Sequence, residues 1–273
     1  MSSLTKRVLT AVVLGAVFLA VLFKTNPEIT AGFITLFLLL ACWEWAGFAG
    51  WQSVAARLMY VALAACLMAA LFLSPDLTAV LPVVLLVAAC WWLFALFMLF
   101  SGAFPLNAPL IALCGFLLLI PAWFCGIRIL LAGDNGNILF LLVFLFVAAA
   151  DIGAYFTGKA IGSHKLLPRV SPGKTWEGFA GGMISATLLA GVVVVLLDWP
   201  LMPALLTGLL TGLVSVVGDL TVSLFKRHAG LKDSGKLLPG HGGILDRIDG
   251  VTAALPLYAA LLYGFGLLPA ATL

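Results

Sequence analysis

The sequence predicts an all-α fold: a polytopic bundle of about nine transmembrane helices that forms one integral membrane domain. Composition is the first observation, because 64% of the 273 residues are hydrophobic, 9% are charged, and the mean hydropathy is +1.21. Soluble domains are closer to half apolar and a quarter charged. The second observation is that the apolar residues fall in runs of about 20, which is the length that crosses a bilayer.

Short polar or proline-containing gaps separate the apolar runs. Pro121 and Pro256 fall inside two runs, where we expect them to kink the helices. Trp43, Trp45 and Trp51 near one helix end are typical of the aromatic belt at a membrane interface. The segments that we expect to be helical are 7–23, 30–49, 56–73, 77–100, 108–131, 137–161, 177–197, 203–226 and 251–269.

Polar residues are unevenly distributed over this single domain, 1–273. The N-terminal part, 1–136, consists of apolar helices, whereas 137–273 contains two polar stretches, roughly 162–176 and 227–250. If the N-terminus is cytoplasmic, all but two of the 14 Lys and Arg residues fall on or near the cytoplasmic side. This positive-inside bias predicts that both polar stretches face the cytoplasm and that the C-terminus lies outside.

Other features exclude several protein classes. No basic arm or aromatic-basic patch indicates nucleic-acid binding. Residues 1–23 resemble a signal peptide, but no convincing cleavage site follows, so we expect a retained first helix. The cysteines form no CxxC pair and lie in apolar runs, so we interpret them as small buried hydrophobic residues rather than zinc ligands or disulfides. They are Cys42, Cys66, Cys90, Cys114 and Cys125.

The stretch from Ser223 to Asp249 concentrates charge in an otherwise apolar chain. A loop that only fixes topology needs Lys and Arg, but this one also contains three Asp, His241 and a Gly-Gly pair. These residues indicate a site for phosphates and a divalent metal. His241 has Gly240, Gly242 and Gly243 around it, and such open backbone can approach a substrate closely.

Three carboxylates make the metal hypothesis specific. Ser215, Asp219 and Ser223 form one polar stripe on a predicted helix, and a carboxylate inside the membrane should face the bundle interior or a water-filled cavity. Asp246 and Asp249 are three residues apart at the start of the last helix, so they can converge. Mg²⁺ uses few carboxylates and takes substrate phosphates as further ligands. A helix N-terminal charge pattern would explain the last two residues, but not Asp219.

The first polar block, 150–178, contains a second set of candidates. Asp151 and Tyr155 are four residues apart and share a helix face, which Lys159 continues. Asp151 is either functional or part of a structural pair with Lys159. We interpret Glu44 and Arg128 elsewhere as interfacial or snorkelling residues.

Ser171-Pro172-Gly173-Lys174-Thr175 has the chemistry of a phosphate-binding loop. It is not a P-loop, because Pro168 occupies the position of the first glycine and we expect no strand before it. Gly173 frees backbone N–H groups, Lys174 brings charge, and a helix begins near Glu177. Ser171 or Thr175 can also cap this helix, which is compatible with phosphate binding.

The polar residues of the last stretch occur in an order that resembles the signature of the phosphatidate cytidylyltransferases, also called CDP-diacylglycerol synthases. Asp151 to Glu177 is similar to a second region of that family, although Ile152 replaces the small hydroxyl residue of many members. Together the two regions cover roughly the C-terminal half. The signature residues are Ser223, Lys226, Arg227, Lys232, Asp233, Gly235, Leu238, Pro239, His241, Gly242, Gly243, Asp246, Arg247 and Asp249.

The resemblance implies that CTP and phosphatidic acid react to CDP-diacylglycerol and pyrophosphate at a bacterial inner membrane. It implies Mg²⁺ as cofactor, with a second cation and a homodimer left open. The expected catalytic residues are Asp219, Lys226, Arg227, Asp246, Arg247 and Asp249, with the three Asp on the metal. The expected substrate-binding residues are Asp151, Tyr155, Ser171, Lys174, Thr175, Ser223, Lys232, Asp233, His241, Gly242 and Gly243.

Three alternative functions agree less well with the sequence. The CDP-alcohol phosphotransferases share the start of a motif at Asp249-Gly250, but Ala254 stands where that motif has Arg, and no Asp follows Asp249. A transporter or channel could use Asp151 and Asp219 as an ion path, but it would spread polar residues through several helices. A purely structural membrane scaffold would not need the clustered charge.

Overall fold

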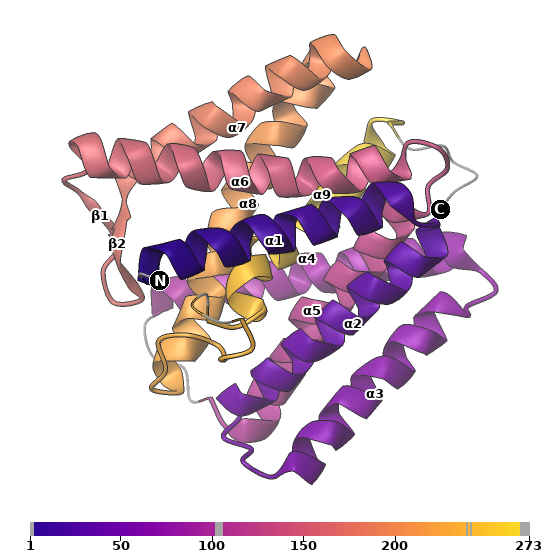
Figure 1. The fold of residues 1–273 in the computed structure, drawn as a ribbon, viewed down its shortest axis with the longest axis vertical. Coiled ribbons are helices and arrows are strands. Elements are labelled where there is room, and N and C mark those ends of the chain that lie inside the picture. Colours follow the sequence, from indigo (N-terminus) through magenta and orange to yellow (C-terminus); the bar gives the residue numbers. More distant parts are fainter. Residues whose placement is uncertain (1–2, 102–105, 239, 241, 268–273) are drawn as a thin grey trace.

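The computed structural model describes residues 3–101, 106–238, 240 and 242–267, and these form a helical bundle with one small β-hairpin (Figure 1). The predicted all-α fold is confirmed, and the predicted segments each match a helix. The helices are α1 Ser3–Lys24, α2 Pro27–Phe48, α3 Val54–Phe72, α4 Leu77–Ser101, α5 Ala108–Leu130, α6 Gly136–Ile161, α7 Trp176–Leu197, α8 Leu201–His228 and α9 Leu245–Gly264. The strands are β1 Lys165–Leu167 and β2 Ser171–Thr175.

Within the described residues, 7 helices, α2 to α8, are long and apolar enough to cross a membrane. In α1, the apolar helical part Val12–Lys24 is shorter. The first turns of α9 contain Asp246, Arg247 and Asp249, so this helix is more polar than the others. The chain is therefore a multi-pass membrane protein, whereas a ninefold crossing stays a prediction.

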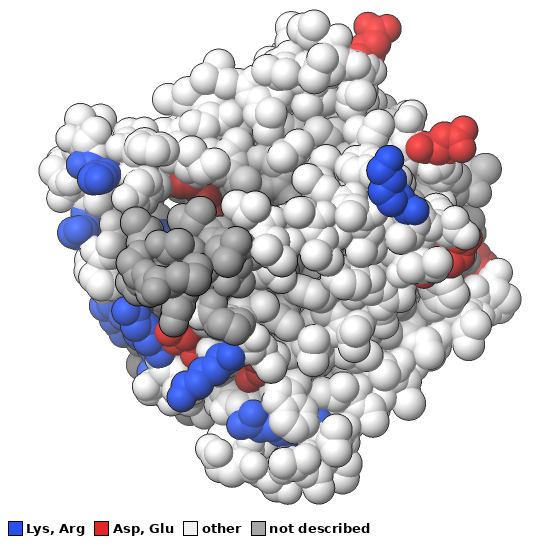
Figure 2. Space-filling model, in the orientation of Figure 1, with Lys and Arg blue, Asp and Glu red and all other residues white. Residues whose placement is uncertain are grey.

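The polar connections gather on one side of the bundle. In Figure 1, the β1–β2 hairpin and the connection between α8 and α9 both lie toward the left and lower left, near the start of α1. Figure 2 shows most of the visible Lys and Arg along the same edges. The two polar stretches predicted from the sequence thus share one side of the molecule.

Small residues allow α6 and α7 to pack almost backbone to backbone. A Cβ added at Gly178 would lie 2.8 Å from the carbonyl oxygen of Ala154, and one at Gly182 would lie 2.6 Å from that of Ala150. Close packing through small residues is a common way to associate helices in a membrane. It places the start of α7, and the strand β2 that leads into it, directly beside Asp151.

α8 and α9 approach each other equally closely at the level of the acidic residues. A Cβ at Gly218 would lie 2.5 Å from the carbonyl oxygen of Asp249, and one at Gly250 would lie 3.2 Å from that of Ser215. Any larger residue at 218 would push the helices apart. This glycine contact is what brings the neighbouring carboxylates, Asp219 and Asp249, to the same level.

Three local predictions are wrong. A strand does precede the Ser171–Thr175 segment, because β1 pairs antiparallel with β2 (Lys165 with Thr175); such short strands leave no clear periodicity in a sequence. Trp45 is fully buried and donates a 2.7 Å hydrogen bond to the carbonyl oxygen of Ile111, so it is not part of an interfacial belt. Cys66 and Cys90 are exposed on outer helix faces rather than buried.

Candidate active site

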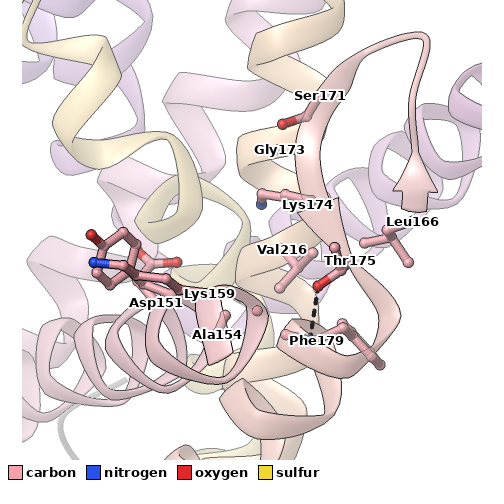
Figure 3. Close-up of a pocket in the computed structure, with 13 residues that line it drawn as sticks. Asp151, Ala154, Lys159, Leu166, Ser171, Gly173, Lys174, Thr175, Phe179 and Val216 are labelled. Carbon is pink, nitrogen blue, oxygen red and sulfur yellow. Dashed lines mark hydrogen bonds between the residues drawn. The ribbon is translucent and has the colours of Figure 1, made fainter. Parts of the chain in front are cut away.

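A pocket of about 460 Å³ lies between α6, the hairpin, α7 and α8. Leu166, Phe179 and Val216 form an apolar wall. Figure 3 shows Lys174 projecting from β2 toward the side on which Asp151 and Lys159 extend from α6. The polar side chains lining the pocket are Asp151, Tyr155, Lys159, Ser171, Lys174 and Thr175. The structure therefore brings the first predicted group of substrate-binding residues together.

Lys174 reaches from this pocket to α8. Its Nζ lies 2.5 Å from Oδ2 of Asp219, and the two side chains are 25% and 32% exposed. The other Asp219 oxygen, Oδ1, accepts a 3.3 Å hydrogen bond from Ser223. Because both partners remain partly accessible, incoming phosphates or cations can exchange with this pair.

Two local contacts fix the hairpin that presents Lys174. Thr175 accepts a 3.1 Å hydrogen bond from the backbone N–H of Gly178, which confirms the predicted capping role of Thr175. Glu177 accepts hydrogen bonds from Ser163 and His164, including a 2.6 Å contact to the His164 ring. Glu177 and His164 therefore tie the base of the hairpin to α7 and contribute to its position.

A second Lys–Asp pair connects α8 with α9. Lys226 Nζ lies 2.7 Å from Oδ1 of Asp246, and the side chains are only 11% and 8% exposed. Oδ2 of Asp246 accepts hydrogen bonds from the backbone N–H groups of Ser234 at 2.8 Å and Gly243 at 3.0 Å. Burial alone would raise the pKa of Asp246, which precedes the apolar part of α9, but the bonds from Lys226 and these N–H groups hold the pKa below its ordinary value.

Asp249 joins the two pairs. Its Oδ1 accepts a 2.8 Å hydrogen bond from the N–H of Gly250, and its carboxylate interacts electrostatically with Asp219, Lys226 and Asp151. Residues from α6, β2, α8 and α9 thus form one charged cluster. Two lysines partly offset the acidic groups, as expected for a site that must also receive polyanions.

The carboxylates fit a magnesium ion in part. Among the described residues, no group of three or more His, Cys, Asp and Glu side chains lies close enough to hold a metal by itself. Mg²⁺ commonly uses one or two carboxylates and completes its shell with water and substrate phosphate. Asp219 and Asp249 repel each other and could share a cation, whereas both Asp246 oxygens already accept hydrogen bonds.

The remaining predicted residues surround the connection between α8 and α9. Gly242 has a left-handed backbone with φ of 80°, and a Cβ there would lie 2.8 Å from Oδ2 of Asp246. Glycine is required at this position both for its conformation and for the close approach. His241 lies outside the described residues. Four further predicted site residues are exposed in the structure: Arg227, Lys232, Asp233 and Arg247.

Sequence reasoning missed Glu44. It was interpreted as interfacial, but its side chain is buried, and it accepts hydrogen bonds from Ser234, Ile244 and Leu245. A carboxylate within an apolar segment is itself a functional signal. The same signal singles out Asp151 and Asp219, but the tryptophans on either side of Glu44 make it resemble an interfacial residue.

The fold and this site define a class: a polytopic membrane protein with a Lys- and Asp-rich site, open to one side, that suits phosphorylated substrates. Comparison with known proteins makes the class specific. The model of the cytidylyltransferase family matches residues 5–265. The chain belongs to this family.

Named relatives share nearly the full length of the chain. A phosphatidate cytidylyltransferase of Pseudomonas aeruginosa is 43% identical over 271 residues, which cover 96% of this chain and 98% of the relative. A phosphatidate cytidylyltransferase of Haemophilus influenzae is 37% identical, with 94% and 97% covered. One of Brucella suis is 38% identical, with 97% and 94% covered.

Proposed function

We propose that this protein is a membrane nucleotidyltransferase that converts CTP and phosphatidic acid to CDP-diacylglycerol and pyrophosphate in phospholipid biosynthesis. The observation that carries the proposal is the charged cluster around the Lys174–Asp219 pair, at the edge of a membrane bundle. Family membership and the named relatives support the same reaction. The site meets the two demands of this reaction, which are charge neutralisation and access for a lipid.

Apolar cavities next to the charged pocket suit the acyl chains. A cavity of about 180 Å³ shares Leu166, Phe179 and Val216 with the charged pocket. A further cavity of about 330 Å³, between α4, α8 and α9, shares Leu96 and Leu213 with that one. We place the lipid phosphate near Lys174 and the acyl chains along this apolar path, where they remain in a hydrocarbon-like environment.

The chemistry requires alignment more than proton transfer. An oxygen of the phosphatidic acid phosphate forms a bond to the α-phosphorus of CTP, and the bond from that phosphorus to the bridging oxygen of pyrophosphate breaks. The attacking phosphate monoester has a second pKa of about 6 and is already largely anionic at neutral pH. The roles left to the protein are to hold two polyanions together and to stabilise the charge on departing pyrophosphate. Lys174 and Lys226 are placed to supply this positive charge.

Magnesium is part of the proposal. Asp219 and Asp249 would hold Mg²⁺, with Asp246 as a third or supporting carboxylate, and a second cation remains open. When bound, Mg²⁺ neutralises triphosphate oxygens and activates pyrophosphate as a leaving group. The lysines reduce the repulsion among the unliganded carboxylates, because Lys174 pairs with Asp219 and Lys226 with Asp246.

The proposed setting is the inner membrane of a bacterium, with the N-terminus and the charged side in the cytoplasm, where CTP is available, and the C-terminus outside. The distribution of cations supports this orientation (Figure 2).

Purified protein tests the function directly. It is incubated with α-labelled CTP, phosphatidic acid and Mg²⁺, and both the labelled lipid and pyrophosphate are measured. Equimolar CDP-diacylglycerol and pyrophosphate, dependent on phosphatidic acid, are expected. Consumption of CDP-diacylglycerol with an added alcohol, without CTP-dependent synthesis, would instead identify a CDP-alcohol phosphotransferase.

A further inference from the structure

Glu44 contacts the proposed active site from the opposite half of the chain. It lies on α2 and is only 3% exposed. Its Oε1 accepts a 3.1 Å hydrogen bond from the N–H of Ile244, and its Oε2 accepts 2.9 Å bonds from the N–H of Leu245 and the hydroxyl of Ser234. One carboxylate therefore binds both ends of the segment 234–245.

The start of α9 explains why a carboxylate is suitable here. The N-cap residue of α9, Ile244, has an apolar side chain and makes no side-chain capping bond. The first N–H groups of a helix need acceptors and carry partial positive charge. Glu44 supplies the missing cap from α2. These N–H groups offset the cost of burying the carboxylate, which would be high if it were left without hydrogen bonds.

The segment is shaped around this carboxylate. A Cβ added at Gly235 would clash with Oε1 of Glu44, and one at Gly243 would clash with Oε2 and with the hydroxyl of Ser234. Both glycines thus allow the backbone to approach the carboxylate on two sides. Such a fit indicates that Gly235 and Gly243 have defined positions against the carboxylate.

The same segment holds the buried pair. The N–H groups of Ser234 and Gly243 bind Oδ2 of Asp246, whose other oxygen pairs with Lys226. Ser234 is thus shared, because its hydroxyl binds Glu44 and its N–H binds Asp246. A shift of the segment would move Asp246 and, through it, Lys226.

We infer that Glu44 is a positioning residue for cytidylyl transfer: it fixes Ser234 and the start of α9 so that Asp246 and Lys226 keep their reactive arrangement. The inference rests on the proposed function. It gives the N-terminal half a role in the reaction, because the anchor of the site lies on α2 and not on the helices that carry the signature residues.

Glu44→Gln is the primary test. Glutamine has the same shape, but its NH₂ group donates hydrogen bonds and cannot accept them. If the NH₂ group replaces Oε1, the bond from Ile244 is lost. If it replaces Oε2, the bonds from Leu245 and Ser234 are lost. We expect kcat to fall about 10- to 100-fold, as when a group that orients the catalytic site is lost, with a smaller change in the KM for CTP. Cleavage by trypsin at Lys232 and Lys236 should become faster.

Two controls separate positioning from general stability. Cys42→Ala removes a thiol from a fully buried position two residues before Glu44 on the same helix, and it should keep the wild-type kcat of the folded protein. Ser234→Ala should have a smaller effect than Glu44→Gln. The double variant should lose less activity than the product of the two single losses, because both residues act through one contact.

The inference is overturned if folded Glu44→Gln keeps a kcat within about twofold of wild type. A twofold difference in rate corresponds to a very small change in the activation free energy. It is also overturned if only the melting temperature falls, or if the double-variant effects multiply. An inactive wild-type protein would instead reject the proposed function. In that case, unchanged trypsin cleavage in Glu44→Gln would still reject the anchoring role.

Discussion

Two Lys–Asp pairs flank the site, and they differ in access. Lys174–Asp219 is 25% and 32% exposed and borders the pocket, whereas Lys226–Asp246 is 11% and 8% exposed. Asp219 has a single further hydrogen bond in the described structure, from Ser223, while Asp246 accepts two from backbone N–H groups. The open pair is suited to exchange partners with substrate and metal, and the buried pair is suited to hold the site in shape.

Removing the charge of Asp219 should have the largest effect on catalysis. Asp219→Asn preserves size but removes a carboxylate from the open pair. We expect kcat to fall about 100-fold or more, by analogy with the loss of one preorganised charge-stabilising group. The melting temperature should change little, because the side chain is partly solvated.

Asp198→Asn provides the matched control. Asp198 ends α7 in a left-handed conformation with φ of 53°, which asparagine also tolerates well. It lies outside the charged cluster, so activity should remain at the wild-type level. Equal activity of both Asn variants would remove Asp219 from the mechanism.

Breaking the buried pair should reduce stability as well as activity. Lys226→Met leaves Asp246 buried without its cation, and such losses cost about 3–5 kcal/mol. Thermal unfolding in detergent should therefore show a clear drop in melting temperature. Adding Asp246→Asn should restore part of the stability but not the activity, and restored turnover in the double variant would contradict a role for this pair in the reaction.

Lys174→Met should mainly weaken substrate binding. A hydrogen bond from a charged group to phosphate contributes about 1.5–3 kcal/mol, so kcat/KM for CTP should fall about tenfold to a hundredfold. Lys165→Met is the control, because it removes the same charge from the same hairpin but outside the pocket lining. Equal losses in both variants would indicate only a general field effect.

The sequence predicts what depends on local pattern and on residue type. Helix positions follow from apolar runs, and Asp246 and Asp249 fall at the start of α9 as expected. The pairing of Lys174 with Asp219 and the contacts of Glu44 do not follow, because they join segments far apart in the chain. No local pattern indicates that a carboxylate on α2 caps α9. The packing of glycine-containing helices determines these contacts.

Cysteine labelling tests whether the two pairs share one side of the membrane. Gly173 and Lys236 are exposed, and a side chain at Gly173 meets no atom within 4 Å. Cysteines at both positions should label from the side opposite to a cysteine at Asp134, in a background without the exposed Cys66 and Cys90. Labelling of all three positions from one side would contradict the proposed orientation.

The dependence of the rate on Mg²⁺ tests most directly whether the open pair belongs to the reactive centre. CDP-diacylglycerol formation is measured over a range of Mg²⁺ concentrations for wild type and for folded Asp219→Asn. If Asp219 helps to hold the ion, the variant should need more Mg²⁺ for half-maximal rate and should reach a much lower maximum. An unchanged Mg²⁺ titration with full specific activity would contradict the assignment of Asp219 and the distinction between the two pairs.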